Sequence, residues 1–149
     1  MCKLFGLLFL GLLLFGCSGN PTAIRGGEIA NKNLHKQRSP IRVIVEVLEG
    51  GVAVMRPVWA GEKGASIINV ADDTLKADIY KLFQEKCGFQ KADLKEVRVV
   101  EHKHPFYYEV WVFSDTQSKN ADGTTGVSLI LNFPASGGTD INLIGNCRS

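Results

Sequence analysis

The sequence predicts an α+β fold: a twisted antiparallel β-sheet of about six to seven strands with one main helix packed on one face. Two observations lead to this prediction. One stretch, residues 74–87, has apolar side chains at helical spacing, and short strand-like runs joined by turn signals lie on both sides of it. Because such short connections join antiparallel neighbours, we expect the strands to form a meander.

Two strands and a tight turn open the predicted sheet. Apolar residues alternate from Ile41 to Val47, which is the spacing of a strand with one buried face. Glu49-Gly50-Gly51 is a turn signal, since glycine adopts the positive φ that a tight hairpin needs. We expect residues 52–59 to return as a second strand and residues 65–70 to form a short third one.

The best-defined element is a helix from about Thr74 to Cys87. Asp72 or Asp73 can cap its first N–H groups, and Gly88 suits a left-handed C-cap. One stripe of the helix is apolar and is expected to face the sheet: Leu75, Ile79, Leu82, Phe83 and Cys87.

Four strand-like runs follow the helix, at residues 96–103, 107–114, 127–133 and 140–147. In the second run, Trp111 and Phe113 lie on the face shared with Glu109, whereas Tyr108 and Val110 lie on the other. One of these two faces must pack under the helix.

The N-terminal segment has a different organisation. Lys3 is followed by an apolar run, Leu4–Phe15, that is too short to span a bilayer and ends at Leu14-Phe15-Gly16-Cys17. This segment resembles the signal peptide and lipobox of a bacterial lipoprotein. The resemblance implies cleavage before Cys17, diacylglycerol on its thiol and, with Ser18 next, sorting to the outer membrane. The alternatives are an ordinary signal peptide or an uncleaved anchor.

Three parts of the chain follow from this interpretation: a signal peptide over 1–16, a lipid anchor and flexible tether over 17–40, and a single α+β domain over 41–149. The tether is predicted because Pro21, Gly26 and Gly27 break regular structure and no apolar period is sustained there.

Cys87 and Cys147 remain once the N-terminal cysteines are assigned to the signal and the anchor. An even pair of cysteines in an exported chain is expected to oxidise. The disulfide would tie the C-terminus of the helix to the last strand. A metal or redox pair is the alternative, although the two cysteines lack the CxxC spacing.

Aromatic side chains are dense on the hairpin that begins at Phe106. Tyr and Trp dominate the energetics of protein interfaces, so one face of this hairpin and the adjoining polar loop are a candidate binding surface. Its residues are Phe106, Tyr108, Val110 and Asp122. The alternative is that these aromatic residues all belong to the core.

His102 and His104 are the candidate metal ligands or catalytic groups. They are two positions apart on a predicted strand and therefore share a face. Imidazole pairs bind zinc or copper, but a zinc site needs three or four ligands and the sequence supplies two. A solvated strand end is the alternative. The chain contains no GxSxG, HExxH, phosphate-loop or CxxC motif.

Loss of Lys3 with the signal takes the formal net charge from +2 to +1, and this near-neutral balance argues against nucleic acid as a partner. The sequence indicates no cofactor. It favours a non-catalytic protein-binding module on the periplasmic side of the outer membrane, whose partner is another envelope protein. Such a module could act in assembly, as an inhibitor or immunity protein, or as an exclusion factor. The alternatives are a small envelope enzyme or metal or ligand carrier using His102 and His104, and a structural lipoprotein without a dedicated partner.

Overall fold

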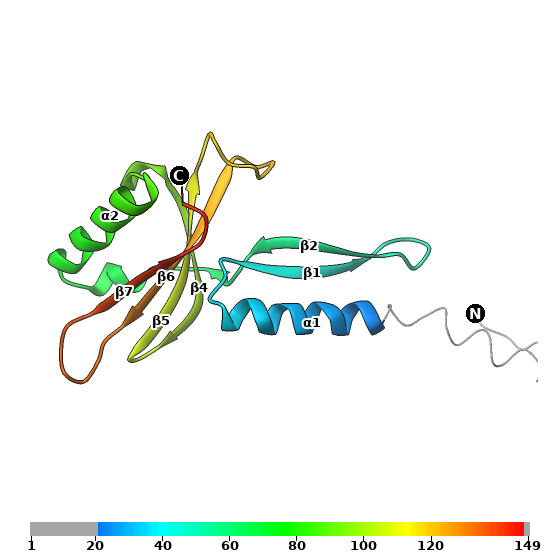
Figure 1. The fold of residues 1–149 in the computed structure, drawn as a ribbon, viewed down its shortest axis with the longest axis horizontal. Helices are drawn as coiled ribbons and strands as arrows, with labels where there is room; N and C mark the ends of the chain where they lie inside the picture. Colours follow the sequence, from blue (N-terminus) through cyan, green and yellow to red (C-terminus); the bar gives the residue numbers. More distant parts are fainter. Residues whose placement is uncertain (1–20, 148–149) are drawn as a thin grey trace, which may run out of the picture.

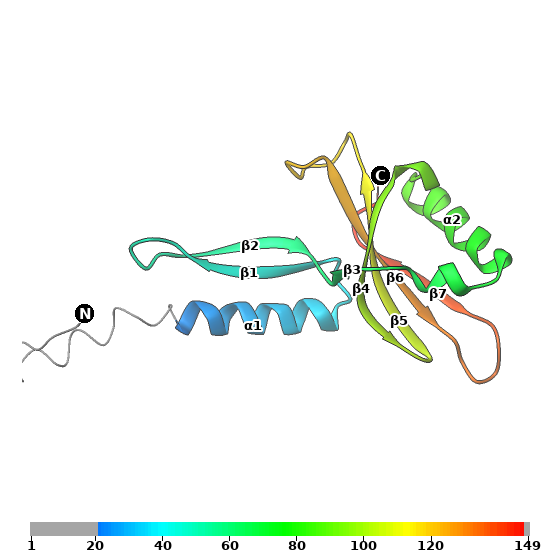
Figure 2. The same ribbon diagram turned by 180° about the vertical axis from the view of Figure 1, so that it is seen from behind.

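The computed structural model describes residues 21–147, which form an α+β fold with two helices and seven strands. Figures 1 and 2 show a sheet body from which a long arm projects. The elements in chain order are α1 (Pro21–Lys36), β1 (Ile41–Val47), β2 (Ala53–Trp59), β3 (Glu62–Lys63), α2 (Asp73–Cys87), β4 (Leu94–Lys103), β5 (Phe106–Ser114), β6 (Thr124–Asn132) and β7 (Asp140–Ile144).

The body is a five-stranded antiparallel sheet in the order β3-β4-β5-β6-β7, with α2 on one face (Figure 1). The predicted fold class and main helix are therefore confirmed. β1 and β2 pair only with each other, so the strands divide between two sheets. Residues 67–70, at the predicted short strand, form a 3₁₀ turn instead, because the Ser66 side chain caps the Ile68 N–H.

The main core lies between α2 and the sheet. Asp72 caps the helix through the Leu75 N–H, and Gly88 ends it at φ 71°, as predicted. Phe83 stacks on Trp111 with ring centroids 4.9 Å apart. Ten residues are fully buried in this core: Ile68, Ile79, Phe83, Cys87, Phe89, Trp111, Phe113, Val127, Leu129 and Leu131.

The predicted disulfide between Cys87 and Cys147 is present. Cys87 is the last residue of α2 and is completely buried. Cys147 follows the end of β7 by three residues. The bond therefore fastens the C-terminus of the helix to the chain beyond the edge strand of the sheet.

The arm consists of α1 packed along the β1–β2 hairpin (Figure 2). The sequence predicted a flexible tether over residues 17–40, and this is wrong for residues 21–36. Gly27 brings the helix so close to β1 that an added Cβ would lie 2.5 Å from Val45 Cγ2. The Asn31 side-chain amide accepts from the Val43 N–H at 2.7 Å and donates to the Val43 carbonyl at 2.9 Å.

A second core cluster fixes the arm to the sheet face opposite α2. It contains Tyr108 and Val110, with exposed fractions of 1% and 0%, so the prediction that they form a binding surface is wrong. The segment after α1 covers them: the Tyr108 hydroxyl donates to the Ser39 carbonyl, and the Arg38 guanidinium lies over the half-buried Phe106 ring. Burial raises the pKa of Tyr108, against the opposing effects of Ser128 and Arg38.

Candidate functional site

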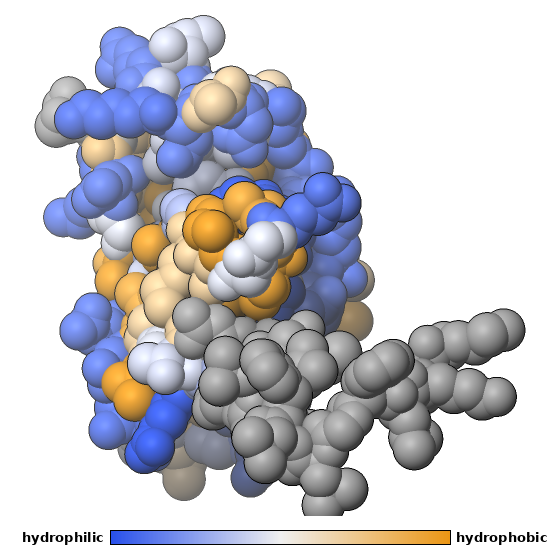
Figure 3. Space-filling model, turned by 90° about the vertical axis from the view of Figure 1, so that its right-hand side faces the viewer, coloured by the Kyte–Doolittle hydropathy of each residue, from blue (hydrophilic) through white to orange (hydrophobic). Residues whose placement is uncertain are grey.

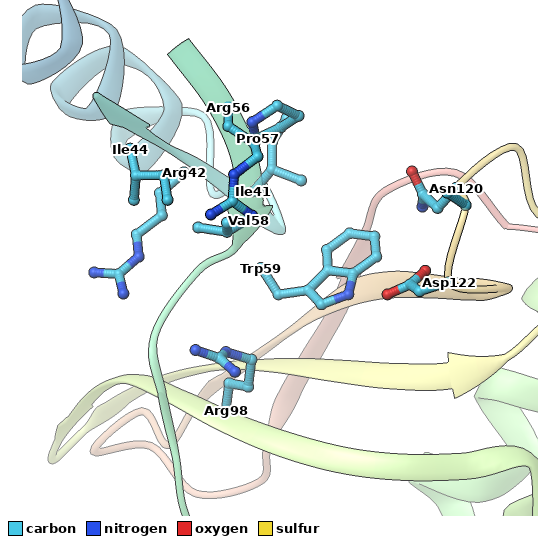
Figure 4. A pocket seen from close by; sticks show the side chains of 11 residues that line it. Ile41, Arg42, Ile44, Arg56, Pro57, Val58, Trp59, Arg98, Asn120 and Asp122 are labelled. Atoms are coloured by element: carbon cyan, nitrogen blue, oxygen red, sulfur yellow. The ribbon is translucent and has the colours of Figure 1, made fainter. Parts of the chain in front are cut away.

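The candidate site is an open groove of about 590 Å³ where the arm meets the sheet body (Figure 4). One wall is the face of the hairpin turned away from α1. Arg42 and Ile44 lie on this face, because side chains alternate along a strand and Val45 faces the helix. Arg56, paired with Ile44 across the hairpin, lies on the same face.

Trp59 forms the centre of the groove and is held by the first residues of β6. Its indole N–H donates to Thr124 Oγ1 at 3.2 Å, and that hydroxyl donates to Asp122 Oδ1 at 2.7 Å. The ring packs on Gly126, where an added Cβ would lie 2.5 Å from Trp59 Cε3. Asp122 is the one residue of the predicted surface that lines this groove, and it orients the tryptophan through Thr124.

Two of the three arginines in the groove are exposed enough to bind a partner. Arg56 pairs with Glu46 at 2.6 Å, and Arg42 contacts Glu62 at 3.2 Å. Both are surface ion pairs, which contribute little to stability and exchange readily. The Nε–H of Arg42 is buried and has no hydrogen-bond partner within residues 21–147, so this guanidinium is not fully satisfied.

Arg98, the third arginine, stabilises the fold and is not free to bind a partner. Its guanidinium donates to the Gly61 carbonyl at 2.8 Å and to Glu96 at 3.0 Å, and its side chain is 15% exposed. Partial burial alone would raise the pKa of Glu96, but hydrogen bonds and charge from Lys63 and Arg98 outweigh it and lower that pKa. Arg98 therefore holds the bend that connects the arm to the body.

His102 lies in a different place, beside the buried carboxylate of Glu109, with Nε2 2.7 Å from Oε1. Glu109 accepts two further side-chain hydrogen bonds, from Ser66 Oγ at 2.6 Å and Trp111 Nε1 at 2.8 Å, and one from the Ile67 N–H at 2.6 Å. Both carboxylate oxygens are thus occupied. The arrangement suits a structural anchor for the 3₁₀ turn.

His104 does not converge with His102 on a common ligand. Its ring stacks on Phe133, with centroids 6.5 Å apart, at the turn between β4 and β5. Within residues 21–147 no group of three or more His, Cys, Asp and Glu side chains is placed to hold a metal ion. The metal hypothesis gains no support from this geometry.

Sequence reasoning missed the groove and the Glu109 cluster for different reasons. Trp59 carried no signal beyond its place at the end of a strand, because the groove exists only through the packing of two sheets. Glu109 did carry a sequence signal, because it is a charged residue among the apolar residues of a core-facing row. Such a residue must be hydrogen-bonded, and partners could have been sought for it.

Cys17, the predicted lipidation site, lies outside the described residues. In the described part of the chain no helix is both long and apolar enough to cross a membrane. Comparison of the chain with protein-family models, with curated protein sequences and with solved structures finds no match.

Proposed function

We propose that the protein is a lipoprotein anchored through Cys17 at the periplasmic side of the outer membrane, where it binds another envelope protein without catalysis. The anchor is supported by the Leu14-Phe15-Gly16-Cys17 motif. The disulfide between Cys87 and Cys147 supports an oxidising compartment, because such bonds form and persist in exported proteins.

The observation that carries the binding role is the half-buried Trp59, which lines the same groove as Arg42 and Arg56. Trp and Arg are the side chains most enriched among residues that dominate binding energy. The indole is already fixed by Thr124 and Gly126, so little side-chain entropy is lost when a partner covers it.

The chemistry of the groove selects a partner segment with an apolar side chain and a carboxylate. The apolar side chain would pack on Trp59 and Ile44. The carboxylate would replace Glu62 or Glu46 as the acceptor for a guanidinium, and Arg binds carboxylates in bidentate geometry. We therefore expect an envelope protein that presents a short acidic and apolar segment.

Charge reversal at two matched positions tests this proposal. Arg56→Glu changes the groove, whereas Lys81→Glu changes an ion-paired position on α2 whose side chain is even more exposed, at 70% against 56%. After cross-linking in intact cells and affinity purification, we expect an envelope partner with the wild type and Lys81→Glu, and at least tenfold less with Arg56→Glu. Equal recovery from all three would show that the groove is not the binding site.

Cys17→Ser tests the anchor independently. The variant is expected to leave the membrane fraction, because two or three acyl chains provide stable anchoring. If it stays with the membranes in the same amount as the wild type, the anchoring part of the proposal is wrong.

A further inference from the structure

Exposed apolar side chains are concentrated on the arm. Seven of the nine large apolar residues that are strongly exposed within residues 21–147 lie on α1 or the β1–β2 hairpin. Leu48 and Val52 flank the hairpin turn and are 51% and 60% exposed. Figure 3, which faces the end of the arm, shows apolar residues gathered there. An apolar patch on a projecting tip indicates a contact with something outside the domain.

The tip of the hairpin lies at the same end of the arm as the start of α1 (Figures 1 and 2). The packing explains why: Asn31 lies beside Val43 and Gly27 beside Val45, so the helix and β1 run in opposite directions. The turn at residues 48–52 is therefore next to the first turn of the helix.

The short distance in sequence between Cys17 and α1 indicates which surface the tip contacts. Three residues separate Cys17 from Pro21, and the four Cα-to-Cα steps between them span at most about 14 Å. If the thiol carries a lipid, the start of α1 stays within that distance of the bilayer surface. The exposed tip, at the same end of the arm, is then held against the headgroups.

We infer that the β1–β2 turn is a second membrane contact, in which Val47, Leu48 and Val52 enter the interfacial region of the leaflet that holds the lipid. This inference rests on the proposed lipidation of Cys17. Glu49 stands among these residues and is exposed, so the tip enters only to the depth of the headgroups. Exposed Arg25 in α1 adds attraction to anionic lipid.

Site-specific photocross-linking of the lipidated full-length protein tests the inference. A photoreactive amino acid replaces Leu48 in one variant and Val70 in the control. Val70 is 82% exposed but lies on the 3₁₀ turn of the body, away from the arm. Both proteins are reconstituted in liposomes of phosphatidylethanolamine and phosphatidylglycerol, floated, irradiated and analysed by mass spectrometry for adducts of phospholipid mass.

We expect phospholipid adducts at position 48 at least tenfold more often than at position 70. Equal yields in proteins that float with the liposomes would overturn the membrane contact and leave the anchor intact. Adducts of position 48 to a second copy of the chain, without lipid, would also overturn it and assign the tip to a protein interface. Failure of the proteins to float would overturn both the anchor and the inference.

Discussion

The side-chain amide of Asn31 on α1 hydrogen-bonds both the N–H and the carbonyl of Val43 on β1. It thereby occupies part of the outer edge of a strand that has a neighbour on one side only. A single amide side chain thus holds the helix at a fixed register along the hairpin.

Replacement of Asn31 by Ala should loosen the arm. Two hydrogen bonds are lost and the polar groups of Val43 stay without a protein partner, which costs about 1–3 kcal/mol. We expect the Val43 amide to exchange at least tenfold faster in hydrogen-exchange NMR. Asn33→Ala, at an exposed position on the same helix, is the control, and in this variant the Val43 amide should exchange at the wild-type rate. Similar exchange in both variants would mean that the Asn31 contact does not hold the helix.

Replacement of Glu109 by Ala should destabilise the body. The change leaves the Ser66 hydroxyl, the Trp111 N–H and the Ile67 N–H without their acceptor, and each buried donor left unpaired costs about 1–3 kcal/mol. Urea unfolding measures the difference. Glu101→Ala is the control, since its carboxylate is partly exposed and has no comparable network. A difference below about 1 kcal/mol between the two variants would contradict the structural role.

Loss of the disulfide through Cys87→Ala with Cys147→Ala should lower the free energy of unfolding by about 2–4 kcal/mol, because the bond closes a loop of 60 residues in the unfolded chain. Chemical denaturation with and without reductant measures this. Reductant should lower the free energy of unfolding of the wild type to that of the double variant, and it should not change the stability of the double variant. A wild type that is insensitive to complete reduction would refute the prediction.

The lowered pKa of Glu96 predicts a defined pH dependence. Its carboxylate, beside Lys63 and Arg98, is easier to ionise in the folded than in the unfolded chain, so it adds stability above the unfolded value of 4.5. That stability disappears as the pH falls through the folded pKa. Glu96→Gln should therefore be less stable than the wild type at pH 7, and the difference should shrink toward pH 3. Thermal unfolding across this range measures it, and a constant difference would count against the ion pairs.

The body of the fold could be predicted because its signals are local. Three features could each be predicted from residue type and spacing alone: the apolar stripe on α2, its caps at Asp72 and Gly88, and the disulfide formed by the even pair of cysteines. The alternation in β5 was also sufficient to separate Trp111 from Tyr108, but not to show that both faces are covered.

The arm could not be predicted because its stability comes from contacts between segments. Gly26, Gly27 and Asn31 are poor helix formers, and they favour a loop when considered alone. In the structure the same residues permit close packing on Val45 and hydrogen bonding to Val43. The groove around Trp59 depends on this arm, so the site was missed together with it.

The length of α1 has a consequence for where a partner is met. Sixteen helical residues rise about 24 Å, and the groove lies at the end of the arm where the helix finishes. Because Trp59 and Arg98 fasten this end to the sheet, the helix acts as a spacer of fixed height. An anchored protein would present its groove in one thin layer above the membrane, and a partner confined to that layer is met at a raised effective concentration.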